Sequence, residues 1–428
     1  MEEAKYSEKE QKELILKLKK DLETEGFETS WQDPFFAWMH PEDAKMKEPQ
    51  SEPKNTFYIC DLPIPKIVPF DLATISITVD KQINFQLSLY YIKILEDEVD
   101  GDAINNVFDR HATEWSVKRT DYFANISSRF SLLWDTEYDA HIEDCLYGKF
   151  PVTSSEKIIA MVNDMQELYL KNVFGRVKQQ YENAAEKLKD EMPDVAKQLT
   201  DLKYSIFYTN PLNTLKNGPI YYLGFNPGGS IENSIYFKDY EENLECFKKK
   251  KRNWCEFIDE TWPPHKEAGN APLQRRVKSI LEIILKELKI DQGISDIFCT
   301  NLYFFRSPNA RKLPKHELLN CWKYHEEFLK IIRPKIVVCN GNGKNISAYT
   351  VFRKYFDSLG KNDIKELDPL KIYGKYSIKS FTIENSFWGI PRVLVLGVPH
   401  LSRFSPEAKI TECTQYIKKK IETLDLWN

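Results

Sequence analysis

From about residue 205 onward, short apolar runs alternate with stretches of helical spacing, and this pattern constrains the fold more than any other feature. The apolar runs lie at 219–223, 296–305, 335–341 and 392–400, and the helical stretches include 271–288 and 314–332. Short, nearly all-apolar strands that alternate with helices are typical of a parallel sheet covered on both faces. We therefore expect an α/β domain here, a three-layer αβα fold around a central parallel four-stranded sheet.

Residues 1–204 follow a different pattern. The first 30 residues carry apolar side chains at helical spacing among many charges, which predicts an amphipathic surface helix. Residues 57–79 and 83–95 alternate β-branched and aromatic residues, as strands do, and helical spacing returns from residue 155. We expect an α+β accessory domain of unknown role over 1–204 and a second domain over 205–428.

Charge separates the same two halves of the chain. Residues 1–200 hold 38 Asp and Glu against 24 Lys and Arg, whereas residues 201–428 hold 26 against 36. A basic domain suits a polyanionic partner, because neutralising phosphates releases counterions. The acidic half is a candidate for shielding that basic face, or for recognising a particular DNA form or a protein partner.

Several classes of protein are disfavoured by the sequence. It has no uncharged apolar stretch of about 18 residues, and its start is too charged for a signal peptide, so we expect no membrane contact and a cytoplasmic location. Eight cysteines occur without one Cys-x-x-Cys pair, which argues against a zinc ribbon or an iron–sulfur framework. We expect reduced, mostly buried thiols, with no metal and no cofactor.

Polar or glycine-rich residues follow each predicted strand, where ligands bind in open α/β sheets. These segments are Gly224 to Gly229, Thr300-Asn301-Leu302, Asn340 to Gly343, and Val398 to Ser405. The glycine spacing after the first strand matches neither the dinucleotide fingerprint nor the P-loop, so the nucleotide-binding interpretation loses its main support.

Taken in this order, the segments resemble motifs of the uracil-DNA glycosylase superfamily, in particular its mismatch-specific, thymine-DNA and single-strand-selective branches. The first family motif has the form G-x-N-P-G, here Gly224-Phe225-Asn226-Pro227-Gly228. The last resembles H-P-S-P-L-S, here His400-Leu401-Ser402-Arg403-Phe404-Ser405. Asn301 in CTNLYFFRSP fits the base-reading asparagine. The resemblance covers roughly 215–425 and does not explain residues 1–200.

The resemblance implies a role for each matching residue. Asn226 would orient the attacking water, and His400 would donate a hydrogen bond to the departing base. Asn301 would read a pyrimidine's Watson–Crick edge, beside Gly224 and Phe225. Phe237 or Tyr236 would stack on the base. Gly228 stands where the most uracil-selective branch carries a tyrosine, which predicts a pocket open to substituted pyrimidines.

The last motif implies contacts with the DNA strand. Ser402 and Ser405 would bind flanking phosphates, and Phe404 would fill the gap left by the flipped base. Leu401 and Arg403 replace two family prolines, which changes the rigidity of the loop, and Arg403 is a candidate phosphate contact. His265 and the basic run 248–252 are lesser candidates.

These expectations describe a monomeric, monofunctional DNA glycosylase. It would hydrolyse the N-glycosidic bond of a flipped uracil-type or modified pyrimidine and leave an abasic site in duplex or single-stranded DNA. An open pocket and a long accessory half favour modified bases, such as those of phage genomes, as a hypothesis of antiviral defence rather than routine repair. Two alternatives are an inactive glycosylase-like sensor that binds nucleic acid and a small-molecule enzyme on a doubly wound sheet.

Overall fold

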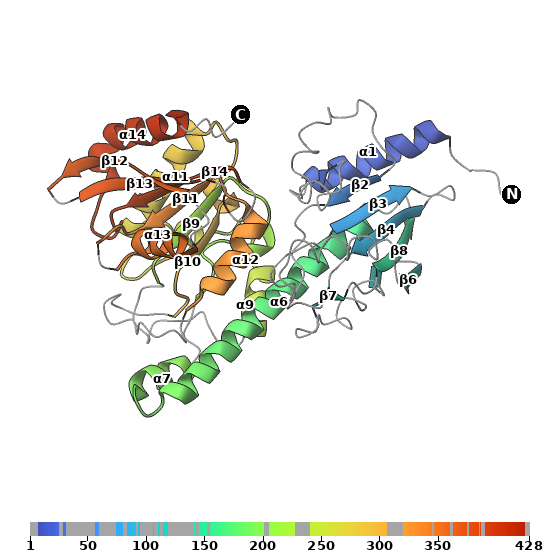
Figure 1. Ribbon diagram of the computed structural model, residues 1–428, viewed down its shortest axis with the longest axis horizontal. Helices are drawn as coiled ribbons and strands as arrows, with labels where there is room; N and C mark the ends of the chain where they lie inside the picture. Colours follow the sequence, from blue (N-terminus) through green and yellow to red (C-terminus); the bar gives the residue numbers. More distant parts are fainter. Residues whose placement is uncertain are drawn as a thin grey trace. The chain divides into compact units, whose positions relative to one another are not determined.

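The computed structural model describes both halves of the chain, with gaps (Figure 1). The described residues are 7–24, 29–30, 56–59, 74–79, 84–90, 93–94, 106, 110–111, 114–118, 140–141, 145–151, 155–200, 205–226, 240–305, 320–344, 346–359, 363–374, 376–384, 386 and 390–423.

The chain divides into two compact units, Met1–Val173 and Phe174–Asn428. The division falls inside helix α6 (Ser155–Leu188), about thirty residues before the expected boundary at 204/205. The sequence pattern changes where the helical segments end, whereas the second half of α6 packs on the C-terminal unit. Phe174 at the start of that half meets Phe207 edge to face, with ring centroids 5.9 Å apart. Tyr181 does the same with Phe305 at 6.4 Å.

The N-terminal unit is an antiparallel sheet with a helix against it. Helix α1 (Glu8–Thr24) buries Ile15, Leu18 and Leu22 and contacts β2 and β3, which confirms the predicted amphipathic helix. The main sheet has the order β1-β2-β3-β4-β8-β6, and each neighbouring pair is antiparallel. Its strands are β1 (Thr29–Ser30), β2 (Thr56–Ile59), β3 (Thr74–Val79), β4 (Asn84–Tyr90), β6 (Glu114–Lys118) and β8 (Cys145–Pro151). A separate pair joins β5 (Lys93–Ile94) to β7 (Ala140–His141).

The C-terminal unit combines a six-stranded sheet with helices. Its strands are β9 (Ile220–Gly224), β10 (Phe298–Asn301), β11 (Ile336–Asn340), β12 (Asp363–Tyr373), β13 (Tyr376–Glu384) and β14 (Arg392–Val398). Its α-helices are α7 (Pro193–Thr200), α8 (Pro211–Thr214), α9 (Tyr240–Lys249), α10 (Glu256–Asp259), α11 (Pro272–Glu287), α12 (Trp322–Ile332), α13 (Ala348–Leu359) and α14 (Ile410–Thr423). Short 3₁₀ turns, η3 (Ile294–Asp296) and η6 (Pro406–Lys409), precede β10 and α14.

The sheet order is β10-β9-β11-β14-β13-β12. The pairs among β10, β9, β11 and β14 are parallel, and β13 and β12 continue the sheet as an antiparallel hairpin. The α/β class predicted from the sequence is confirmed. The sheet itself is mixed and has six strands, and the hairpin over 363–384 was not predicted.

Successive residues of each central strand face opposite sides of the sheet, as strand geometry requires. On one side, Ile220 and Tyr222 pack with α11 and α14 in one buried cluster. On the other side, Tyr221 and Phe298 meet α12, where Phe328 lies 5.3 Å from the Phe298 ring. Helix α13 contacts β11 and β14. Both faces of β9 are buried, which explains its all-apolar sequence.

The cysteines that the structure describes with their side chains form no disulfide, and all of them but Cys246 are buried. None of the described helices combines the length and the apolar character that a membrane span needs.

Candidate functional site

The strand order places a topological switch point at the carboxyl ends of β9 and β11. The chain leaves β9 toward β10 on one side, and it leaves β11 toward β14 on the other. Neighbouring parallel strands whose connections diverge leave an opening beyond their carboxyl ends, and ligands of open α/β sheets bind there. Gly224 and Asn340 end the two strands at this switch point, where such folds have their opening.

Asn301 ends β10 in register with Gly224, the last residue of β9. The Asn301 side chain is fully buried and leans over the end of β9. A Cβ added at Gly224 would lie 2.5 Å from its Oδ1, so only glycine permits this approach. In the part of the chain that the structure describes, neither polar atom of the Asn301 carboxamide has a hydrogen-bond partner. A buried carboxamide without partners is costly, which suggests a ligand that supplies both a donor and an acceptor.

His325 fixes the backbone next to Asn301. It lies on α12, is fully buried, and places Nε2 3.0 Å from the carbonyl oxygen of Leu302. Because a carbonyl only accepts, Nε2 carries the proton, and Nδ1 accepts from the Tyr221 hydroxyl at 2.8 Å. Burial lowers the pKa of His325 to about 4, so the ring is neutral at pH 7. The neutral His325 ring, hydrogen-bonded through both nitrogens, therefore has a structural role.

His400 follows β14 and has a defined tautomer. Its Nδ1 receives the backbone N–H of Ser402 at 3.3 Å and lies 2.7 Å from the Ser402 hydroxyl oxygen. A backbone N–H only donates, so the neutral ring carries its proton on Nε2. Partial removal of the ring from solvent lowers its pKa, and the positive charge of Arg403 lowers it further. The geometry thus provides a neutral Nε2–H donor.

Asn340, the last residue of β11, and Gly341, which follows it, hold the His400 segment in place. Asn340 is buried, and its Oδ1 accepts the backbone N–H of Leu401 at 3.0 Å, while its side chain also hydrogen-bonds Tyr222. Gly341 has φ +110°, a conformation that favours glycine, and its N–H donates to the carbonyl of Val398 at 2.9 Å. A Cβ there would lie 3.8 Å from Cδ2 of His400. The imidazole therefore lies beside the end of β11.

Asn301 and His400 consequently converge, although their strands are separated by two others. The carboxamide lies over the end of β9 and the imidazole beside the end of β11, and these strands are neighbours. Neighbouring strands run about 4.8 Å apart. The amide and the imidazole donor thus lie at the carboxyl ends of the two neighbouring strands that form the switch point. Sequence reasoning assigned no role to Asn340 or Gly341, although both stand in the third polar segment.

Asn226 is half-buried and is the last described residue after β9. The backbone that leads to it continues beside the Asn301 segment: the carbonyl of Gly224 accepts from Leu302 at 2.8 Å, and that of Phe225 from Tyr303 at 3.0 Å. Phe225 is itself buried against the Tyr303 ring at 5.3 Å. The candidates Gly228, Tyr236 and Phe237 lie outside the described residues.

The 400–405 loop exposes only some of its predicted DNA contacts. Ser402 and Arg403 are exposed, and Ser405 is half-buried. Phe404 is fully buried and packs in a tilted arrangement against Tyr373 and Tyr376, with ring centroids 5.9 and 6.0 Å away. The predicted wedge role of Phe404 is wrong for this conformation, because a ring inside the core cannot enter a base stack.

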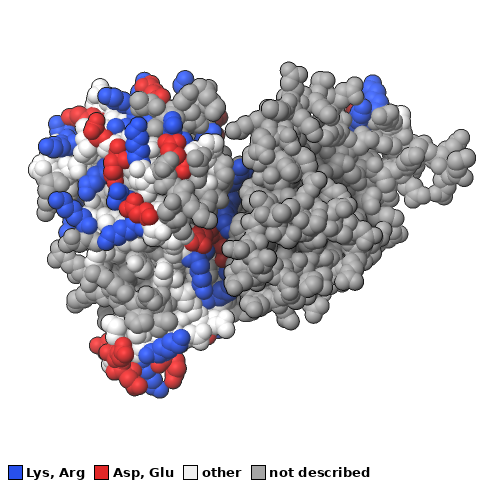
Figure 2. All heavy atoms as spheres, viewed as in Figure 1, with Lys and Arg blue, Asp and Glu red and all other residues white. Residues whose placement is uncertain are grey.

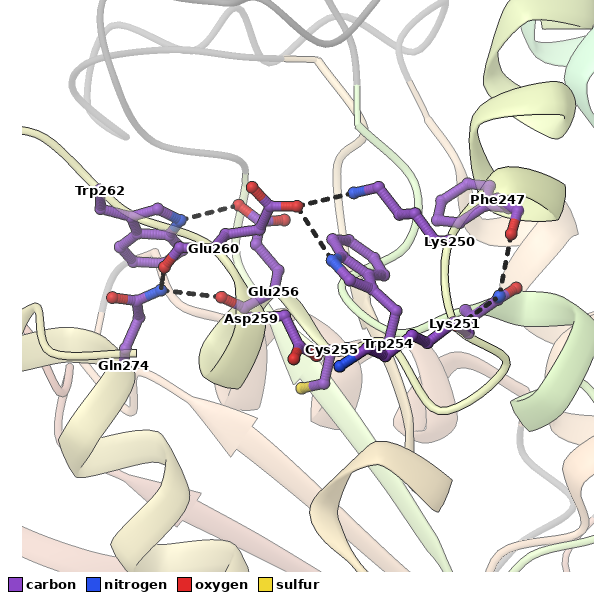
Figure 3. A network of polar contacts seen from close by, with 11 residues as sticks. Phe247, Lys250, Lys251, Trp254, Cys255, Glu256, Asp259, Glu260, Trp262 and Gln274 are labelled. Carbon is purple, nitrogen blue, oxygen red and sulfur yellow. Dashed lines mark hydrogen bonds and ion pairs between the residues drawn. The ribbon is translucent and has the colours of Figure 1, made fainter. Parts of the chain in front are cut away.

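A polar network fixes the connection from α9 to α11, on the path from β9 to β10 (Figure 3). Glu260 accepts from Lys250 at 2.8 Å and from the Trp254 indole at 2.9 Å. Gln274 donates to the carbonyls of Glu256 and Glu260 at 2.8 and 2.7 Å. Lys250 also lies 3.3 Å from the Trp254 ring centroid. Within the basic run 248–252, Lys250 is thus a structural cation, while the lesser candidate His265 is exposed.

Basic and acidic side chains are interspersed over the described part of the visible face of the C-terminal unit (Figure 2). Any contact with a polyanion on this face would therefore depend on local groups of cations. Among the described residues, no cluster of three or more His, Cys, Asp or Glu could hold a metal ion.

No protein-family model matches the sequence, and no curated protein matches it significantly.

Proposed function

We propose that the C-terminal unit is a DNA glycosylase that hydrolyses the N-glycosidic bond of a flipped pyrimidine. In this proposal β10, β9, β11 and β14 form a parallel four-stranded core between two helical layers, and the carboxyl edge of that core is the active site. The proposal rests on the motif resemblance and on one structural observation above all. That observation is the buried carboxamide of Asn301, without a described partner, at the same opening as His400.

The reaction assigns a separate task to each residue. A flipped base would enter between the carboxamide and the imidazole, and Asn301 would both donate to and accept from its Watson–Crick edge. Nε2–H of His400 would donate to the base carbonyl oxygen, which gains negative charge as the bond from N1 to the sugar C1′ breaks.

Asn226 would orient the water that completes the reaction. The oxygen of this water forms the new bond to C1′ and the water releases a proton. The base leaves with the electron pair of the broken bond. Because an amide is a poor base, stabilisation of the leaving base carries most of the catalysis.

A single-turnover excision assay tests the proposal. Duplex and single-stranded DNAs, each with one altered pyrimidine, are incubated with the full chain, and strand cleavage at abasic sites is measured after alkali. We expect product from at least one base. We expect the rate to fall on the order of 10²–10³-fold in His400→Ala, as for the loss of one preorganised donor. Asn226→Ala should also lose most of the rate.

A matched control comes from outside the proposed site. Asn270→Ala removes the same type of side chain as Asn226→Ala from an exposed position before α11, and we expect this variant to excise like wild type. If wild type binds DNA and releases no altered base, the chain is the nucleic-acid-binding sensor and not an enzyme. Equal loss of rate in Asn270→Ala would remove Asn226 from its assigned role.

A further inference from the structure

We propose that the tip of the β12–β13 hairpin is a binding surface for an unpaired nucleic-acid strand, with Tyr373 as a stacking platform and Lys371 as a phosphate contact. This inference deepens the proposed function and rests on it, because it places the strand next to the same opening. It concerns a hairpin that the motif resemblance left without a role.

The hairpin tip lies at the carboxyl edge of the parallel strands. Strand β13 runs antiparallel to β14, so that Lys379 pairs with Gly397 near the end of β14, whereas Glu384 pairs with Arg392 at its start. The residues before Lys379 therefore extend beyond the end of β14. Lys379 Nζ donates to the carbonyl of Asn342 at 3.0 Å, and Asn342 Nδ2 donates to the carbonyl of Gly397 at 2.7 Å. The hairpin is thus tied to the segment that follows β11.

Aromatic packing fixes the tip to the 400–405 loop. Tyr373, Tyr376 and the buried Phe404 form one cluster, and the two tyrosine rings lie 5.3 Å apart. The backbone N–H of Phe404 donates to the carbonyl of His400 at 3.1 Å. Displacement of the tip would therefore be transmitted to the loop that carries the proposed donor.

Tyr373 is held by this cluster and is nevertheless 41% exposed. An exposed aromatic ring with a rigid support suits stacking on a base, and such stacking tolerates any sequence. Bases in a duplex already cover each other's faces, so the ring is suited to an unpaired base. The proposed reaction provides a locally unpaired strand, because the reacting base leaves its stack.

The charges around Tyr373 favour a polyanion. Residues 370–379, LKIYGKYSIK, contain three lysines and no aspartate or glutamate. Lys371 and, on the adjoining loop, Arg403 are exposed. The acidic residues nearest in sequence on β12 are Glu366, which pairs with Arg353, and Asp368, both toward the other end of the hairpin. The combination of an aromatic platform with cations matches single-stranded nucleic acid better than a peptide or a membrane.

Fluorescence anisotropy of a labelled oligothymidylate tests the surface without any excision. With the full chain, Tyr373→Ala should weaken binding about tenfold to a hundredfold, as loss of base stacking does, whereas Tyr373→Phe should bind almost as wild type. Lys371→Ala should lower the slope of log K against log salt by about 0.7, the value for one phosphate of a single strand. Lys365→Ala, an exposed lysine at the other end of the same strand, is the matched control and should leave the slope unchanged.

Three results would overturn the inference: binding unaffected by Tyr373→Ala, equal effects of the two lysine variants, or no binding of oligothymidylate by wild type. If Tyr373→Ala weakens binding of a fully paired duplex as much as it weakens binding of the single strand, the preference for unpaired bases is likewise refuted. Failure of the proposed function is a separate observation. A wild-type chain that binds the oligonucleotide through Tyr373 and excises no altered base would keep this surface and lose the glycosylase assignment.

Discussion

Gly224 determines how closely two strand ends can approach in the proposed site. Its missing Cβ leaves room for the Asn301 carboxamide, which lies where any other residue would place a side chain. The sequence identified both residues as candidates, because both follow apolar runs and match family motifs. Their contact could not be read from the sequence, since it depends on the register between β9 and β10.

Replacing Gly224 with Ala should therefore destabilise the protein by about 1–3 kcal/mol, as overpacking of a filled interior does, and should reduce excision. The free energy of unfolding is measured by urea denaturation in wild type, Gly224→Ala, Asn301→Ala and the double variant. We expect the alanine at 224 to cost much less when Asn301 is also alanine, because the atom 2.5 Å away is then absent.

Gly218→Ala is the matched control for this cycle. It lies shortly before the same strand, and its added Cβ would come no nearer than 3.8 Å to another atom. Additive effects of the two site substitutions would contradict the contact as the cause of the loss.

At the scale of elements, the second half of α6 belongs to the C-terminal unit through one ion pair as well as through aromatic packing. Arg176 donates from both terminal nitrogens to the two oxygens of Glu327 on α12, each at 2.6 Å. Both side chains are mostly buried. A bidentate pair away from water is stronger than an exposed one, and removal of one partner leaves the other uncompensated.

We expect Arg176→Met to lower the free energy of unfolding of the C-terminal unit by about 2 kcal/mol, the loss typical of a charge-assisted hydrogen bond. The double variant Arg176→Met, Glu327→Met should recover much of this loss, because no charge then remains buried. Glu182→Gln on the same helix, whose carboxylate is exposed, should change stability by less than about 0.5 kcal/mol. Unfolding in denaturant, followed in the full chain, gives all three values. A double variant less stable than Arg176→Met would refute this account.

The strands predicted correctly in the C-terminal unit were those whose residues are buried on both sides of the sheet. Every residue that the structure describes in β9, β10 and β11, and all but the first of β14, is buried, and most of these side chains are apolar, so the sequence marks the four strands plainly. Strands β12 and β13 form the antiparallel edge, where exposed lysines alternate with apolar residues and no apolar run results. The burial of Phe404 depends on Tyr373 and Tyr376 in that hairpin, so its orientation could not be predicted without it.

For the molecule as a whole, the charge balance of the two halves indicated a boundary but not its position. A helix that crosses from one unit to the other carries no break in sequence pattern, and only its contacts show that the division falls near Val173. The net charge of the C-terminal half likewise does not tell how its charges are distributed, since side chains of both signs are interspersed on the visible face of the C-terminal unit (Figure 2). The response of the fold to pH depends on individual buried groups that titrate, more than on the net charge of either half.

His325 makes the stability of the C-terminal unit depend on pH. Its pKa is about 4 in the folded protein and near 6.5 when exposed, so the unfolded chain binds more protons between these values. The contribution is complete above pH 6.5 and is lost as pH falls toward 4, by about 3 kcal/mol in total at 1.4 kcal/mol per pKa unit.

Urea denaturation of the full chain at pH 8, 6.5, 5 and 4 should show this slope in wild type and in His265→Gln, an exposed histidine. In His325→Gln, stability at pH 8 should be lower, because the Tyr221 and Leu302 contacts are disturbed, and this part of the slope should vanish. A slope that persists unchanged in His325→Gln would assign the acid sensitivity to other groups.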